Sequence, residues 1–176
     1  SPALKGEAYL VPVTYMNSSA DLKAFVGYHG GVVCTSSNAA GVLEWALERA
    51  GENGKVLFFP DQHLGRNTAL AMGYQDDDIA VWNPMLKPDW NDLNSSKFVL
   101  WHGYCSVHQR FTVEQIDDLR KENPGALVIA HPECDRAVVD AADASGSTEM
   151  IRRYVADAPS GAVIGVGTEI HLVKRL

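Results

Sequence analysis

Short runs of apolar, often β-branched residues alternate along this chain with longer segments in which apolar residues recur at helical spacing. The runs predict strands over Tyr9–Thr14, Val32–Cys34, Val56–Phe59, Phe98–Trp101, Leu127–Ala130 and Ala162–Val166. The segments between them predict helices that begin after Ser18 or Ser19, Ser37 or Asn38, Thr112 and Ser147. Since parallel strands need crossover connections, usually helices, the alternation predicts an α/β fold of three-layer α/β/α units with short parallel sheets.

One stretch interrupts this alternation. Residues 74–97 contain three consecutive aspartates, two prolines and two tryptophans. We expect a long surface excursion here, around a short strand at Ile79–Trp82, because loops of this length are uncommon and usually functional.

The two halves of the chain also resemble each other. VPVTYMNSSADLKAF in the first half and LVIAHPECDRAVV in the second both have the order strand, polar turn, helix. Such an echo indicates two copies of one α/β unit. We therefore expect one domain over residues 1–103, with an inserted loop at 74–97, and a second over residues 104–176.

Composition excludes several classes of protein. The 176 residues carry a net charge of −7 without a basic tract, which disfavours binding to nucleic acid or to anionic lipid. Apolar runs of about five residues are far shorter than the ~20 needed to cross a bilayer. Three widely spaced cysteines without a secretion signal indicate a reduced, cytoplasmic protein.

Polar residues gather where the predicted strands end, which is the edge at which parallel α/β sheets bind ligands. Cys105 follows one strand and has His102 and His108 nearby, so it could be a nucleophile, a metal ligand or an inert thiol. A structural zinc site would need a second pair of ligands, which the sequence does not offer. His131 and Glu133 flank Pro132, and they could be an acid/base pair or a surface ion pair.

Two Ser/Thr-rich turns precede predicted helices, at residues 35–38 and 146–148. Their hydroxyl and backbone N–H groups could bind a phosphate or a carboxylate. Simple N-capping of the following helix is the alternative.

Seven motifs occur in an order that resembles the quinolinate synthase (quinolinate synthetase A) family. They are YMNSSA from Tyr15, CTSSNA from Cys34, PDQHLG from Pro60, WHGYCSVH from Trp101, HPEC from His131, GST from Gly146 and GTE from Gly167. The resemblance covers nearly the whole chain after its first residues.

The resemblance implies a transferase-type synthase of NAD biosynthesis. Members condense iminoaspartate with dihydroxyacetone phosphate to give quinolinate, and L-aspartate oxidase is a possible source of the iminoaspartate. They use a 4Fe–4S cluster held by three cysteines, with one open iron acting as a Lewis acid. Their fold has three α/β domains around a pseudo-threefold axis, with the active site at the junction. This chain would supply the second and third domains.

The resemblance also implies roles for single residues. Cys105 matches a cluster ligand, and His131, Glu133 and Tyr15 match catalytic positions. Positions that bind substrate or lie near the cluster are matched by Asn17, Ser36, His108, Ser147 and Thr148.

Cys34 and Cys134 do not match ligand positions, so only one of the three cluster cysteines is present. We therefore expect a fragment of such an enzyme, inactive and free of iron by itself. Two other interpretations stay open. One is a non-catalytic α/β module that binds anions at Ser36 and Ser147, and the other is a redox or zinc protein centred on Cys105 and His108.

Overall fold

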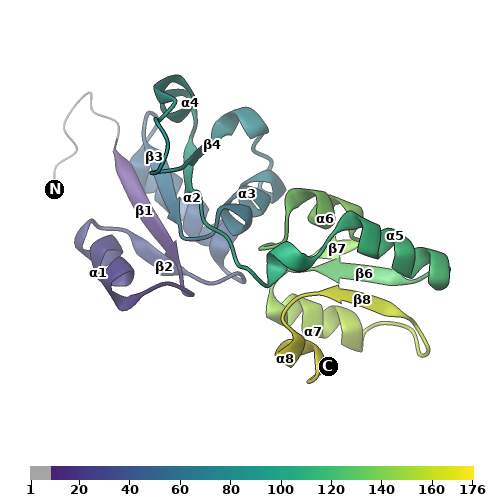
Figure 1. Ribbon diagram of the computed structural model, residues 1–176. Helices are drawn as coiled ribbons and strands as arrows, with labels where there is room; N and C mark the ends of the chain where they lie inside the picture. Colours follow the sequence, from purple (N-terminus) through teal and green to yellow (C-terminus); the bar gives the residue numbers. More distant parts are fainter. Residues whose placement is uncertain (1–8) are drawn as a thin grey trace. The chain divides into compact units, whose positions relative to one another are not determined.

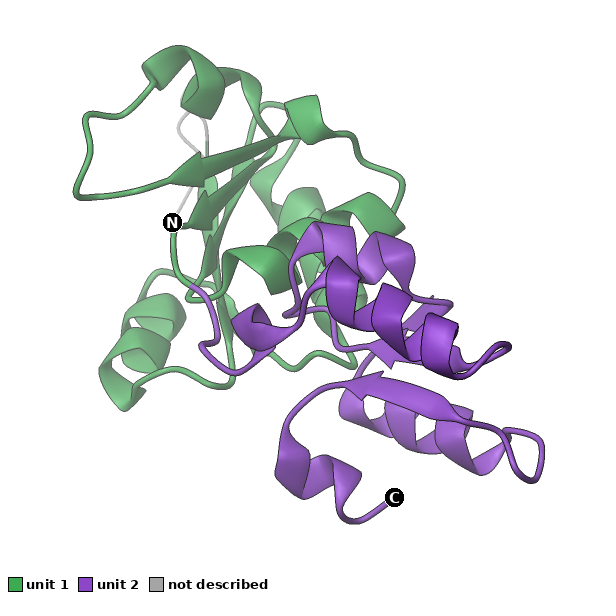
Figure 2. Cartoon of the chain, turned by 45° about the vertical axis from the view of Figure 1, so that its right-hand side comes forward, with its two compact units in different colours: residues 1–103 green, residues 104–176 purple. Residues whose placement is uncertain are grey.

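The computed structural model describes residues 9–176 of the chain, which form two compact units. Unit 1 ends at Gly103, and unit 2 runs from Tyr104 to Leu176 (Figure 2).

Unit 1 is a parallel sheet with helices on both faces (Figure 1). Its elements are β1 (Leu10–Tyr15), α1 (Ala20–Tyr28), β2 (Val32–Cys34), α2 (Ala39–Ala50), β3 (Lys55–Phe59), α3 (Gln62–Ala71), the 3₁₀ helix η1 (Asp76–Asp78), β4 (Ile79–Trp82), α4 (Trp90–Ser95) and β5 (Phe98–Trp101). The five strands lie in the order β2-β1-β3-β5-β4, and all pairs are parallel.

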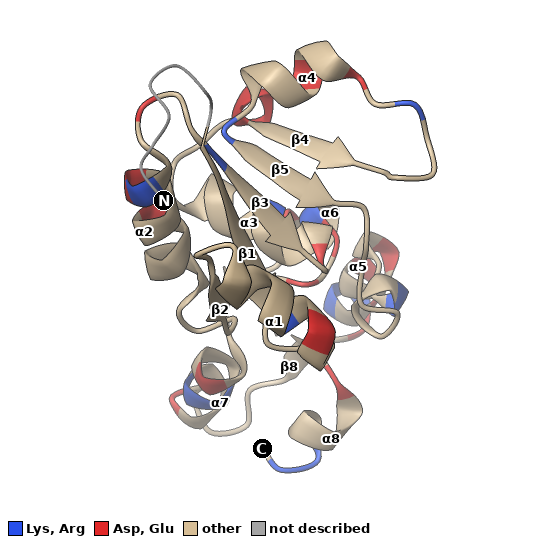
Figure 3. Ribbon diagram, turned by 90° about the vertical axis from the view of Figure 1, so that its left-hand side faces the viewer, with Lys and Arg blue, Asp and Glu red and all other residues tan. Residues whose placement is uncertain are grey.

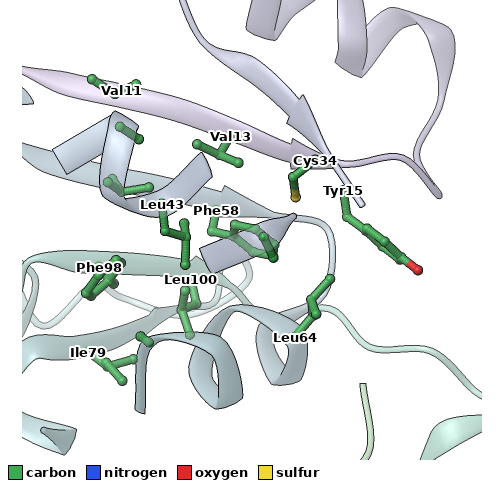
Figure 4. Close-up of a cluster of buried hydrophobic side chains, with 14 of the residues drawn as sticks. Val11, Val13, Tyr15, Cys34, Leu43, Phe58, Leu64, Ile79, Phe98 and Leu100 are labelled. Carbon is green, nitrogen blue, oxygen red and sulfur yellow. The ribbon is translucent and has the colours of Figure 1, made fainter. Parts of the chain in front are cut away.

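The core of unit 1 lies between this sheet and helices α2 and α3. Alternate strand residues face it because side chains alternate across a pleated strand. Val11, Phe58 and Leu100 are fully buried there together with Leu43 of α2 (Figure 4). Gly65 lets α3 approach closely, since an added Cβ would lie 2.7 Å from the Leu100 side chain. The apolar runs of the sequence therefore become strands buried on this face.

Unit 2 contains a smaller parallel sheet in the order β7-β6-β8. Its elements are η2 (His108–Arg110), α5 (Val113–Glu122), β6 (Leu127–Ala130), α6 (Arg136–Ala141), β7 (Ala144–Ser145), α7 (Thr148–Ala156), β8 (Ile164–Gly167) and α8 (Ile170–Val173). Helices α5 and α6 lie on one side of the sheet and α7 on the other (Figure 1). The order β7-β6-β8 corresponds to β2-β1-β3 of unit 1, as an internal repeat predicts.

The predicted fold class is confirmed, and each predicted strand is present within two residues of its expected ends. The N-caps predicted at Ser19, Thr112 and Ser147 are also confirmed, because each hydroxyl accepts a hydrogen bond from a backbone N–H of the first turn. Asn38 precedes α2 without capping it, and its Oδ1 accepts instead from the Thr35 N–H at 2.7 Å.

The prediction of a surface excursion at residues 74–97 is partly wrong. The segment forms η1, β4 and α4, and β4 pairs in register with β5 at the edge of the sheet. Its side chains also enter the core: Tyr74 packs edge-on against Phe98 with ring centroids 4.9 Å apart. In the part of the chain that the structure describes, no helix combines the length and apolar character that a membrane span requires.

Candidate functional site

The carboxyl ends of the strands of unit 2 bring together several of the predicted side chains. His131 directly follows β6, and its backbone N–H donates to the Gly167 carbonyl oxygen of β8 at 2.9 Å. The Cys134 N–H then donates to the His131 carbonyl oxygen, which closes a turn around Pro132. This turn fixes His131 and Glu133 at the sheet edge, and η2 places His108 beside them.

The two imidazoles and the carboxylate form one buried group. The rings of His108 and His131 stack with centroids 4.8 Å apart. Glu133 Oε2 lies 3.2 Å from His131 Nδ1 and 3.5 Å from His108 Nδ1. The exposed fractions are 5% for His108, 1% for His131 and 4% for Glu133. The alternative of a surface ion pair is therefore wrong, because this pair is buried.

Both imidazoles favour the neutral form. Burial and, as the smaller cause, the neighbouring His108 together lower the pKa of His131 to about 3. Burial also lowers the pKa of His108, while the Glu169 carboxylate acts in the opposite direction. His131 Nδ1 accepts a hydrogen bond from the Glu133 backbone N–H at 3.3 Å, so this nitrogen presents a lone pair. Glu133 Oε2 lies close enough to Nδ1 for the two groups to share a proton when one of them carries it.

Thr168 is a member of this group that the residue assignments from sequence missed. It follows β8, is 5% exposed, and its Oγ1 lies 3.4 Å from His108 Nε2. A hydrogen bond there holds the plane of the His108 ring and leaves Nδ1 facing Glu133. The signal for it was its place in the GTE motif directly after a predicted strand.

Cys105 lies next to the buried group and is only half-buried. One ligand atom each from Cys105, His108 and Glu133 lie within 4.8 Å of one another. Thiolate, imidazole and carboxylate are all ligands of zinc and related transition metals, so these three side chains could hold a metal ion.

The remaining predicted residues lie at other strand ends. Ser147 follows β7, where its hydroxyl caps α7 by accepting from the Met150 N–H at 3.4 Å, and Thr148 is exposed at the first turn of that helix. In unit 1, Tyr15 ends β1 and is 6% exposed at the margin of the core (Figure 4). Asn17 is exposed just beyond β1, and Ser36 lies in the turn after the neighbouring strand β2.

Comparison with known proteins shows the family of this chain. The family model described as quinolinate synthetase A protein matches residues 4–176. The chain belongs to this family. It is 58% identical to a quinolinate synthase of Corynebacterium glutamicum over 99% of this chain and 44% of the relative. Relatives with the same name from Rhodopirellula baltica and a Nocardioides species are 53% and 52% identical, over 95% of this chain and 43% and 44% of their own lengths.

The chain thus spans less than half the length of the quinolinate synthases that it matches. This matters for the iron–sulfur cluster that membership in the family implies, because such a cluster is held by several cysteine thiolates. Cys34 is fully buried at the end of β2, and burial raises the pKa of its thiol to about 12. Cys134 is also fully buried, and its Sγ donates to the Gly167 carbonyl oxygen at 3.5 Å. Cys105 is the one cysteine of this chain that fits a cluster ligand, so these residues alone do not fit a whole cluster.

Proposed function

We propose that this chain is part of a quinolinate synthase, which condenses iminoaspartate with dihydroxyacetone phosphate to quinolinate for NAD biosynthesis in the cytoplasm. One observation carries the proposal: the buried group of His108, His131 and Glu133 lies beside the half-buried thiol of Cys105. Membership in the family supports it, since the relatives are named for this activity. Units 1 and 2 would correspond to the second and third of the three related domains.

Proton transfer is the role of His131 and Glu133 in this proposal. The substrates contain more oxygen and hydrogen than quinolinate, so condensation must release phosphate and water, and several protons must change place. The His131 imidazole and the Glu133 carboxyl group, whose Nδ1 and Oε2 atoms lie 3.2 Å apart, would accept a proton from one substrate atom and return it to another. Tyr15 is a further catalytic residue in this proposal.

Cys105 would provide one of the three thiolates of a 4Fe–4S cluster, and the other two would come from outside this chain. When bound, the cluster would supply an iron that acts as a Lewis acid. His108 would lie near the cluster, held by Thr168 at its Nε2.

Substrate binding must rely on local donors, because both substrates are anions and the chain carries a net charge of −7. Ser36 lies in the turn that leads into α2, and Ser147 and Thr148 lie at the beginning of α7, where hydroxyl groups and the first backbone N–H groups favour an anion. The amide of Asn17 adds a neutral donor. L-aspartate oxidase would be the partner that supplies iminoaspartate.

The test uses a chimaera in which this chain replaces the matched segment of the C. glutamicum relative. Quinolinate formation is measured anaerobically, with iminoaspartate generated by L-aspartate oxidase. We expect the chimaera to be active, and Glu133→Gln to lower the rate by ~100-fold or more, the size of a lost general acid/base. Glu149→Gln is the matched control, because Glu149 is a surface residue that pairs with Arg152 and Arg153. Equal rates for Glu133→Gln and the control would contradict the role of Glu133, and a folded but inactive chimaera would contradict the proposal and favour a non-catalytic anion-binding module.

A second candidate rests on the grouping of Cys105, His108 and Glu133. One thiolate, one imidazole and one carboxylate match a site for a single zinc ion with an open fourth position. Metal analysis of the 176-residue chain purified in air separates the candidates, since zinc tolerates oxygen. One zinc per chain that is lost in Cys105→Ser would support this second candidate.

A further inference from the structure

On one face of the sheet of unit 1, no helix of the described residues covers the neighbouring strands β3 and β5. Within unit 1, β3 and β5 pack most extensively on α2 and α3, which lie on the core side. On the opposite face, α1 packs on β1 and β2, and α4 packs on β4. Figure 3 looks onto this face, with β3 and β5 between α1 and α4. Parallel sheets are normally covered on both faces, so this gap requires an explanation.

The gap is apolar and hollowed. A cavity of about 440 Å³ lies between Leu22 and Phe25 of α1 on one side and Trp82 and Trp101 on the other, with Leu57 and Phe59 in its lining. A second cavity of about 350 Å³ continues past Leu57 to Leu93 of α4. Phe25 remains 46% exposed although its ring centroid lies 6.3 Å from that of Phe59.

The lining excludes a charged ligand. Among the described residues that line the two cavities, Lys55 alone carries a charge, and its Nζ already donates to the Asn94 carbonyl oxygen at 2.8 Å. An apolar surface of this kind is stabilised by removing it from water, at about 25 cal/mol per Å². The occupant must therefore present an apolar stripe.

The width of the gap fits one helix. Neighbouring strands lie about 4.8 Å apart, so two strands form a strip roughly as wide as an α-helix, whose diameter with side chains is about 10–12 Å. A single amphipathic helix would cover β3 and β5 between α1 and α4.

Unit 2 shows such a helix beside α6, the counterpart of α1, over β6 and β8, which correspond to β1 and β3. Its order β6, α6, β7, α7, β8 repeats the order β1, α1, β2, α2, β3, and α5 precedes β6. Helix α5 packs beside α6 and over β6 and β8: Ile116 clusters with Val128, and Leu119 lies so close to Gly165 that a Cβ there would be 2.6 Å from its Cδ2. The described residues of unit 1 contain no counterpart of α5 before β1.

We infer that the apolar face of β3 and β5 binds an amphipathic helix supplied by the part of the polypeptide that the longer relatives carry beyond the matched segment. The length of these relatives supports this occupant, since 56% of the C. glutamicum protein lies outside the match, being the remainder after the 44% covered. The inference does not depend on the proposed catalytic function, because none of the residues involved belongs to the candidate site.

Cysteine labelling tests the inference. Phe25→Cys places a thiol at the rim of the gap, and Tyr28→Cys is the matched control on the same helix, at a side chain that is 88% exposed and does not line either cavity. Alkylation of each is followed by peptide mass spectrometry in the 176-residue chain and in the chain extended by the flanking sequences of the C. glutamicum relative. The buried native thiol of Cys34 reports in both that unit 1 is folded.

We expect the extension to slow alkylation of residue 25 by about tenfold or more while residue 28 changes by less than about twofold, because a thiol under a packed helix reacts only after local opening. Equal labelling of residue 25 with and without the extension, while Cys34 stays protected, would overturn the inference. Protection of residue 25 in the 176-residue chain that increases with protein concentration would also overturn it, in favour of a second copy of this chain.

Discussion

Burial of His131 in its neutral form predicts that unit 2 loses stability as the pH falls. The folded state holds the pKa of His131 at about 3, below the ordinary value of 6.5, so the unfolded chain binds more protons between these values. The contribution of His131 to stability is therefore complete above pH 6.5 and decreases as the pH falls towards 3. Between pH 7 and pH 5 the loss is about 2 kcal/mol, since each pH unit well below 6.5 costs about 1.4 kcal/mol.

Two surface carboxylates with lowered pKa values do not contribute to this loss. Interactions with arginines lower the pKa of Glu149 to about 2, and a backbone hydrogen bond, aided by Arg120, lowers the pKa of Asp143, so both carboxylates stay ionised between pH 7 and pH 5. His108 should add to the loss, because burial lowers its pKa as well.

The assay is amide-resolved hydrogen exchange of β6 in unit 2, which gives the free energy of opening at each pH. All four tryptophans, at positions 45, 82, 90 and 101, lie in unit 1, so their fluorescence during urea unfolding provides a reference for the other unit. His131→Asn should make the free energy of opening of β6 less dependent on pH, whatever the effect of the substitution on stability at pH 7. His171→Asn, at a largely exposed histidine of unit 2, should leave it unchanged. A free energy of opening for β6 that stays constant or rises from pH 7 to pH 5 would refute the reasoning.

Three further predictions concern single side chains. Among the three native cysteines, Cys105 should be alkylated fastest, because Cys34 and Cys134 are fully buried. Peptide mass spectrometry after a short pulse of alkylating reagent measures the three rates. Faster labelling of either buried thiol would contradict the structure. Gly65→Ala should destabilise unit 1 by about 1–3 kcal/mol in urea unfolding, since its Cβ would overlap Leu100 and Phe58, whereas Gly41→Ala, with open space around its Cβ, should not destabilise it. Thr168→Val should shift the Nε2 resonance of His108 in ¹⁵N NMR while Thr168→Ser preserves it, and identical spectra for the two variants would exclude the hydrogen bond.

Local patterns were sufficient to predict most of the sheet. The strands of unit 1 are apolar runs bounded by polar or turn residues, and Ser19, Thr112 and Ser147 are strong N-cap residues in front of helical patterns. The segment at residues 74–97 was harder, because its aspartates, prolines and tryptophans are typical of a loop. Its four-residue strand β4 is stabilised by pairing with β5, a contact that no local pattern contains.

The candidate site shows a similar division. Each of Cys105, His131 and Glu133 could be singled out as a polar residue after a strand, but local sequence left a surface ion pair open for the last two. Burial decided the question, and burial depends on how η2 and β8 pack around His131. Thr168 could not be assigned a role from sequence because its partner, His108, lies sixty residues away.

The central claim is that Cys105 belongs to the same site as His108 and Glu133 and serves as a cluster ligand there. Iron and sulfide are measured per polypeptide after anaerobic reconstitution of the chimaera with the C. glutamicum flanking sequences. We expect about four iron and four sulfide ions per chimaera polypeptide, which is a complete 4Fe–4S cluster, and no stable cluster in Cys105→Ser. Cys134→Ser, which alters a fully buried thiol outside the ligand group, should retain the cluster. A full cluster in Cys105→Ser, or its loss in Cys134→Ser alone, would contradict the claim.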